Sequence, residues 1–238
     1  MSPIEIEAAA RAEGETRNEL EKDLYALLLL YFEKASKAAL LGYVKDATPT
    51  VPERLIEALE GVLRSHGAKV GETFGLSDLN ESLFPQWLDE RAKESSQQIS
   101  ATTQKNVIAA IVLATKELVE AAEDSSRRSV ARAAYAQVSR TFKSRAETGA
   151  ITETTASSES SKFHTAEAAT LHKKTWVTMN DGIVRATHVL ANMQEVDFDA
   201  TFTVGGYQMR FPADYSLGAP VKEIIHCRCM AIYTEGRK

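Results

Sequence analysis

The residues best suited to chemistry lie in one short segment near the C-terminus, His226-Cys227-Arg228-Cys229, which holds both cysteines of the chain. Imidazole nitrogen and thiolate sulfur are the usual donors of tetrahedral zinc sites. Together with His188, the segment offers a candidate metal-ligand set of His188, His226, Cys227 and Cys229, with zinc as the cofactor. The alternative is that no cofactor binds. If the segment is a strand, the two cysteines share one face as small buried apolar residues and His226 points to the other face. That geometry weakens a four-ligand site and favours a set of His188, Cys227 and Cys229 with a further ligand unknown.

The spacing of Cys227 and Cys229 also limits their redox chemistry. A disulfide between residues one position apart is strained and closes almost no loop, so reduced thiols in a cytosolic setting are expected. A Cys/His nucleophilic pair is the second chemical option. Because neither a protease nucleophile motif nor an oxyanion-hole glycine run accompanies the cysteines, we predict no catalytic residue and no enzyme activity.

A run of basic residues lies upstream of these candidates. The formal net charge of -5 excludes a globally basic nucleic-acid-binding protein, but it leaves room for a local basic face. An ordinary solvated helix face is one interpretation of the run. The other is contact with DNA phosphates or with an acidic partner, and the candidate residues for DNA contact are Arg127, Arg128, Arg132 and Arg140.

The elements that must position these residues change character near residue 145. Before it, apolar residues recur at helical spacing, and several narrow, Ala-rich faces indicate an elongated bundle rather than a compact globule. The most apolar stretch, residues 24–32, is far shorter than the roughly 20 residues that a membrane span requires. We therefore expect an elongated, mostly α-helical N-terminal region with no membrane contact.

Beyond Lys173 the pattern becomes strand-like. Polar and apolar residues alternate, and Gly205-Gly206 between two apolar runs is typical of a β-hairpin turn. The expected elements are a strand at 174–178, a short helix at 184–190 and strands at 198–204 and 207–211. The predicted fold class is α+β, with a small C-terminal α+β domain after the helical region.

Six short segments of this C-terminal part follow one another in an order that points to one family. The first is Arg145-Ala-Glu147-Thr-Gly-Ala150-Ile-Thr152-Glu153, and the last is Glu223-Ile-Ile-His226-Cys227-Arg228-Cys229. Between them come Lys174-Thr-Trp176, Arg185-Ala-Thr-His188, Val204-Gly205-Gly206 and Phe211-Pro212-Ala-Asp214. In this combination, over about residues 130–233, the chain resembles the Mu F-like phage head morphogenesis family. It departs from the family pattern at His226, where Asn is common, and at Thr187, where Ser is usual.

The resemblance implies a minor head protein of a tailed bacteriophage or prophage, acting in capsid morphogenesis. Its implied partners are the portal protein and the capsid shell or scaffold proteins, with non-specific DNA contact left open. The implied location is the interior of the virion head, and the host cytoplasm during assembly. The alternative function is a small Cys/His-dependent enzyme or a phage-borne toxin domain.

The resemblance also changes the interpretation of the Ser- and Thr-rich stretch at 148–162. Composition alone predicts a linker there, whereas the family implies that Thr152 and Glu153 are helical and pack against the C-terminal domain. We adopt the second view and divide the chain into a portal- or capsid-contacting helical region, 1–144, and a Mu F-like domain, 145–238. In that domain we expect a structural polar cluster of Glu153, Lys174, Trp176, Arg185 and Glu223, in which Arg185 pairs with one of the two glutamates.

Overall fold

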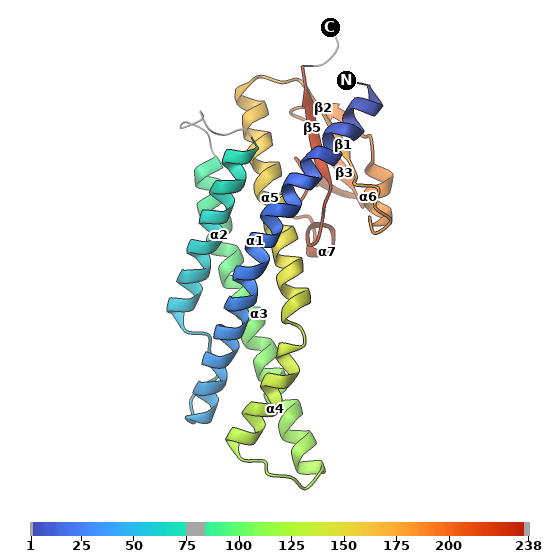
Figure 1. Cartoon of the computed structure of the whole chain (residues 1–238). Helices are drawn as coiled ribbons and strands as arrows, with labels where there is room; N and C mark the ends of the chain where they lie inside the picture. The colour runs from blue at the N-terminus through green and yellow to red at the C-terminus, as the bar shows by residue number, and fades with distance from the viewer. Residues whose placement is uncertain (1, 75–83, 236–238) are drawn as a thin grey trace. The chain divides into compact units, whose positions relative to one another are not determined.

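The computed structural model describes residues 2–74 and 84–235 (Figure 1). The chain first forms the helices α1 (Pro3–Val44), α2 (Glu53–Thr73), α3 (Phe84–Glu120), α4 (Arg127–Ser139) and α5 (Phe142–Ala168). The remaining elements are β1 (Lys173–Val177), α6 (Ala186–Ala191), β2 (Glu195–Asp197), β3 (Phe202–Val204), β4 (Tyr207–Met209), α7 (Val221–Ile224) and β5 (Met230–Thr234). The prediction of an α+β fold with a helical N-terminal region is confirmed. None of the described helices combines the length and the apolar character that a membrane crossing requires.

The chain divides into two compact units whose boundaries are not consecutive in sequence. The first, the mixed unit, comprises Met1–Leu24, Ser65–Leu88 and Thr148–Lys238, and the second, the helical unit, comprises Tyr25–Arg64 and Asp89–Glu147. The division at residue 144 that we expected from the sequence therefore differs from the units of the structure. The reason is that α1, α2 and α3 are long, and different stretches of each helix pack into different cores.

In the helical unit, the core combines small aliphatic residues with a few aromatic rings. The ring of Phe32 stacks on that of Phe142 with 6.2 Å between centroids. The Arg145 guanidinium lies 4.1 Å from the centroid of Phe32 and donates a hydrogen bond of 2.8 Å to Thr103 Oγ1. Most of the expected helical stripes are buried along α1 and α3, as at Leu28, Ala35, Val107 and Ala114, whereas Leu27 is 45% exposed.

In the mixed unit, an antiparallel sheet with strand order β2-β1-β5 is covered on both faces. On one face, α1 packs Ile6 and Ala10 against Val177 and Met230. On the other face, Trp176 of β1 joins a core cluster formed with α5, α6, α7 and the β3–β4 pair. Because β1 is covered from both sides, residues 174–177 are all buried.

The hairpin predicted at Gly205-Gly206 is confirmed as the pair β3–β4. Gly205 has φ +58° and Gly206 has φ +85°. A two-residue turn that matches the twist of its strands needs positive φ at both central positions, which glycine adopts without a steric penalty.

Helix α5 runs through the Ser- and Thr-rich stretch, so the linker interpretation drawn from composition is wrong. Every residue from Ala150 to Ser161 is buried. Buried hydroxyls need partners, and here they bond to carbonyls within the helix and beyond it. Thr152 Oγ1 donates to the Thr148 carbonyl at 2.6 Å, and Thr155 Oγ1 donates to the Cys227 carbonyl at 2.8 Å. A helix with small polar side chains on all sides is thus the centre of the mixed unit.

A buried ionic cluster joins α1, α5 and β5. Arg17 pairs with both Glu13 and Glu159, and Lys162 Nζ lies 2.8 Å from an oxygen of each of these carboxylates. Glu159 also accepts the Ala231 N–H at 2.7 Å. With two carboxylates against two cations, the cluster is electrically balanced, which a buried site requires.

Candidate metal centre

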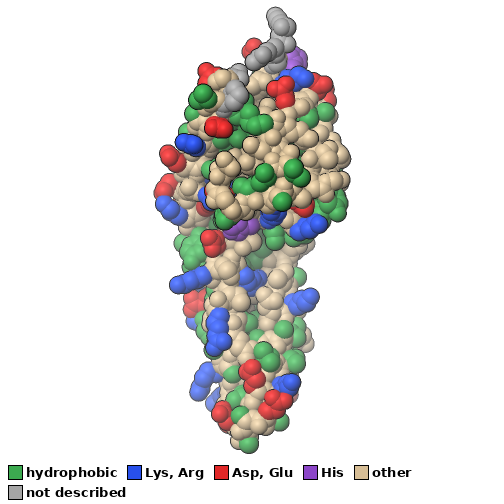
Figure 2. Space-filling view, turned by 90° about the vertical axis from the view of Figure 1, so that its right-hand side faces the viewer, with side chains coloured by type: hydrophobic (Ala, Val, Ile, Leu, Met, Phe, Trp, Pro, Cys, Tyr) green, Lys and Arg blue, Asp and Glu red, His purple; other side chains and the backbone are tan. Residues whose placement is uncertain are grey.

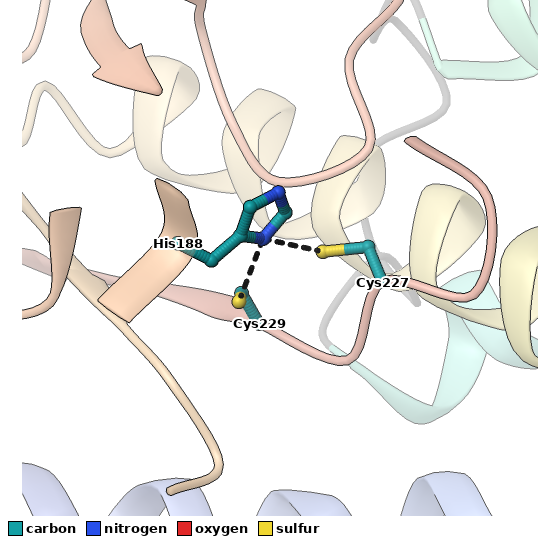
Figure 3. A group of neighbouring side chains, drawn as sticks. All are labelled: His188, Cys227 and Cys229. Carbon is teal, nitrogen blue, oxygen red and sulfur yellow. Dashed lines mark hydrogen bonds between the residues drawn. The ribbon is translucent and has the colours of Figure 1, made fainter. Parts of the chain in front are cut away.

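Three of the four metal ligands predicted from the sequence meet in the mixed unit (Figure 3). His188 Nδ1 lies 3.3 Å from Cys229 Sγ and 3.6 Å from Cys227 Sγ. The three donor atoms all lie within 4.8 Å of one another. Each of these side chains is at most 3% exposed. The arrangement is a compact, buried set of one imidazole and two thiols.

His188 comes from α6, whereas both cysteines lie in the irregular segment between α7 and β5. The strand alternation that we considered for this segment is wrong, because β5 begins only at Met230. His226 has φ +56°, a left-handed conformation that turns the chain just before Cys227. Both thiols nevertheless point toward His188, as the same-face placement of the two cysteines also predicted.

Long-range hydrogen bonds hold the backbone of this cysteine segment in place. Thr155 donates to the Cys227 carbonyl as described above, and the His226 N–H donates to Thr152 Oγ1 at 2.8 Å. The Arg17 guanidinium donates to the Cys229 carbonyl at 3.2 Å. The buried polar side chains of α5 and α1 therefore fix the positions of the two thiols.

A buried carboxylate orients the imidazole from its other side. His188 Nε2 lies 3.2 Å from Glu223 Oε2, and Thr187 Oγ1 donates to the same oxygen at 2.8 Å. A proton on Nε2 that is donated to the carboxylate leaves the lone pair of Nδ1 facing the sulfurs. Pairing of this kind between a carboxylate and a histidine is the usual second layer of metal-binding histidines.

The two thiols of the centre have opposite pKa shifts. A hydrogen bond from Cys229 is the main cause that lowers the pKa of Cys227 well below its ordinary value; burial opposes this, and His188 adds to it. The same hydrogen bond and burial raise the pKa of Cys229 well above its ordinary value, and the Trp176 indole opposes that rise. The Trp176 N–H is itself fully buried and has no hydrogen-bond partner among the described residues. The site therefore favours the thiolate form of Cys227 and the protonated form of Cys229.

A cavity of about 110 Å³ adjoins the three donors. Its lining includes His188 and both cysteines, together with His226, Arg228 and Asp181. His226, the fourth predicted ligand, thus lines this cavity but is not part of the three-donor group. Chemically, the centre can hold a soft divalent metal ion, or it can place an imidazole beside a thiol of low pKa.

The residues of the expected polar cluster occupy different places in the mixed unit. Trp176 packs edge-on against the His188 ring, with 5.6 Å between centroids, and Glu223 hydrogen-bonds the same ring. Arg185 donates to the Ile225 carbonyl, and Glu153 is buried in α5. The Arg185 bond leads to a carbonyl at the end of α7, so this arginine helps to hold the turn that precedes the cysteines.

Lys174 lies apart from the His188 centre, in an aromatic environment. Its ammonium donates to the Arg210 carbonyl at 2.8 Å and lies 5.3 to 5.5 Å from the ring centroids of three phenylalanines, Phe163, Phe198 and Phe202. Burial, with a smaller contribution from Arg210, lowers the pKa of Lys174 to about 8. The side chain therefore serves the packing of β1 rather than the metal centre.

The four arginines predicted as DNA contacts lie in the helical unit and differ in their surroundings. Arg127 pairs with Asp46, donates to the Tyr43 carbonyl at 3.0 Å and lies over the Tyr43 ring. The other three, Arg128, Arg132 and Arg140, are exposed. A phosphate-binding face would thus depend on these three arginines more than on Arg127.

Sequence reasoning missed three residues that support the centre, namely Arg17, Thr155 and Glu159. Their partners are far away in the chain, so no local pattern identifies them. The one available signal is Glu159 itself, a carboxylate within a run of serines. A charge at that position of a buried helix implies a buried cation as its partner.

Comparison of the chain with family models, with curated proteins and with solved structures gave no significant match. The similarity to the Mu F-like family therefore stays a prediction that depends on the order of the six segments.

Proposed function

We propose that this protein is a minor head protein of a tailed phage or prophage, which acts in capsid morphogenesis by binding the portal. The observation that supports this most is that the first and last of the six resembling segments bond directly to each other. Thr152 of the first accepts the His226 N–H of the last at 2.8 Å. Because these distant segments contact each other in the fold, their residues would recur together in the members of a family. The role of that family is assembly.

Three of the four middle segments are connected to the same place. Arg185 donates to the Ile225 carbonyl, and Trp176 packs against His188. A Cβ atom added at Gly205 would lie 3.0 Å from Glu223 Oε1, so the hairpin turn approaches the carboxylate that orients His188. Members of five of the six segments thus meet at one buried centre, and this favours a structural role for the motif.

Exposed apolar side chains in the helical unit support a protein partner. Ile108, Val112 and Val119 follow one face of α3 at helical spacing, and Val112 is 65% exposed. On α1, Leu27, Leu30 and Leu41 are also exposed. Figure 2 shows apolar side chains on the surface among charged ones. Apolar side chains that repeat along a helix commonly mark a surface for protein binding.

Co-expression with the portal protein of the phage or prophage that carries this gene tests the proposal. We expect the chain to co-purify with the portal oligomer, and Val112→Glu with Val119→Glu to reduce the recovered amount at least tenfold. Glu57→Gln, at an exposed position of α2, is the matched control and should leave recovery unchanged. Failure of the wild-type chain to bind the portal would contradict the proposed function.

A small Cys/His-dependent enzyme is the second candidate, and one observation favours it. His188 Nδ1 lies 3.6 Å from Cys227 Sγ, beside a cavity, which is the arrangement of an imidazole that activates a thiol nucleophile. Turnover of any substrate that is abolished by Cys227→Ala would support an enzyme function over assembly.

A DNA-binding role is compatible with the first proposal. It predicts salt-dependent retention on DNA that is lost when Arg128 and Arg132 are neutralised.

A further inference from the structure

We propose that His188 Nδ1 and the thiolates of Cys227 and Cys229 bind one zinc ion, and that its fourth position opens on the adjacent cavity and holds an exchangeable water. This inference is independent of the proposed function. A phage head protein need not bind zinc, and a zinc-binding protein need not belong to a phage head.

The distances between the donors match those of a tetrahedral zinc site. With Zn–S of about 2.3 Å and Zn–N of about 2.05 Å, a tetrahedral angle puts nitrogen and sulfur about 3.6 Å apart. His188 Nδ1 lies 3.3 Å from one sulfur and 3.6 Å from the other. The two sulfurs of such a site would be about 3.8 Å apart, within the 4.8 Å that encloses all three donors. The two nitrogen–sulfur distances therefore match a tetrahedral zinc site to within a few tenths of an ångström.

The charges of the centre also suit a divalent ion. Binding replaces the thiol protons of Cys227 and Cys229 by Zn²⁺, and the protons leave to solvent, so the metal with its two thiolates is neutral. A neutral group is tolerated in a site where all three side chains are buried. The buried Trp176 N–H, which has no partner among the described residues, then acquires a thiolate as its acceptor.

The second layer needed by a metal-binding histidine is present before any metal binds. Glu223 is 4% exposed, and its carboxylate lies 3.2 Å from His188 Nε2. This contact favours the tautomer in which Nδ1 is free to act as the ligand atom. A histidine with a merely structural role would not need its free nitrogen to point at two thiols.

The fourth position faces the cavity of about 110 Å³. That volume exceeds the roughly 10–15 Å³ needed to hold a water molecule. Arg228 lines the cavity, with its guanidinium 3.6 Å from Asp181 and hydrogen-bonded to Asn18. A zinc ion with three protein ligands and one water is the pattern of reactive rather than purely structural sites, and the arginine favours small anions as replacements for the water.

Zinc content and competition with a chromophoric chelator test the ligand set. We expect one zinc per wild-type chain and one per His226→Ala chain. Glu223→Gln should bind zinc about 10–100-fold more weakly, and Cys229→Ser should lose more affinity than that. Because Cys229→Ser has the potential to misfold, the wild-type protein stripped of metal by a chelator serves as a second measurement; it should regain one zinc per chain when zinc alone is added. No uptake by the stripped protein, or equal affinity in Cys229→Ser, would overturn the site.

Cobalt substitution tests the open position. The Co²⁺ protein should show tetrahedral d–d bands and thiolate charge-transfer bands, and azide should shift the d–d bands. His226→Ala should give the same spectrum and the same response to azide. A spectrum insensitive to azide, or a spectrum altered by His226→Ala before azide is added, would show that a protein side chain fills the fourth position, and it would overturn that part of the proposal.

Discussion

Replacing Glu159 by glutamine should destabilise the mixed unit by about 3–5 kcal/mol, the usual cost of leaving a buried charge without its partner. Glutamine keeps the size of the side chain, and its carbonyl can still accept the Ala231 N–H. The change therefore isolates the charge. The Glu159 side chain is fully buried and that of Arg17 is 3% exposed, so solvent cannot compensate for the loss.

The magnitude follows from the balance of the cluster. In the wild-type chain, Glu13 and Glu159 face Arg17 and Lys162. Glu159→Gln leaves two buried cations with the single carboxylate of Glu13. Arg17→Met in the same chain restores the balance, so the double variant should be more stable than the sum of the single effects predicts, by about 0.5–3 kcal/mol.

Urea denaturation followed by tryptophan fluorescence is the assay, because both tryptophans, Trp87 and Trp176, lie in the mixed unit. The control is Glu19→Gln, which removes an exposed ion pair with Lys22 and should cost less than about 1 kcal/mol. Burial raises the pKa of Glu159, while Lys162 and Arg17 oppose that rise. If burial prevailed and the group were protonated, Glu159→Gln would be nearly silent. A loss below about 1 kcal/mol, or additive effects in the double variant, would show that Glu159 does not balance a buried positive charge.

Three further predictions concern single positions of the mixed unit. Burial lowers the pKa of His66 from 6.5 to about 4, so the unfolded chain binds a proton between these pH values that the folded chain does not. Unfolding free energy should thus fall by about 3 kcal/mol from pH 6.5 to pH 4, and in urea titrations His66→Gln should remove that share. Lys174→Met should change the melting temperature little, since an apolar chain of similar length can replace a buried charge. Lys174→Ala should instead cost about 2–5 kcal/mol of unfolding free energy. Equal losses of stability in the two variants would contradict this. Gly205→Ala should lower the melting temperature more than Gly206→Ala. Both glycines have positive φ, but only a Cβ at Gly205 would approach Glu223. Equal thermal shifts would exclude a role for that contact.

The local elements of the mixed unit could be predicted because their signals are local. Alternation predicted a strand at 174–178, which the structure has at Lys173–Val177. The pair Gly205-Gly206 predicted the hairpin, since only glycine adopts positive φ freely at both turn positions. The helical stripes of α1 and α3 could also be predicted, because an apolar face repeats every three or four residues.

The features that depend on distant partners could not be predicted from composition or spacing. Thr155 and Cys227 are 72 residues apart, so nothing near Thr155 shows that its hydroxyl is satisfied inside a core. The cysteines illustrate the same limit. The left-handed conformation of His226 removes the strand alternation, and only the fold brings Cys227, Cys229 and His188 together.

The most direct test of the proposed function is quantitative mass spectrometry of purified heads from the phage or prophage that encodes this chain, with and without its gene. We expect a few copies of the protein in each wild-type head, and defective or DNA-poor heads when the gene is deleted. Absence of the protein from both mature heads and assembly intermediates, together with normal heads from the deletion strain, would contradict the proposed function.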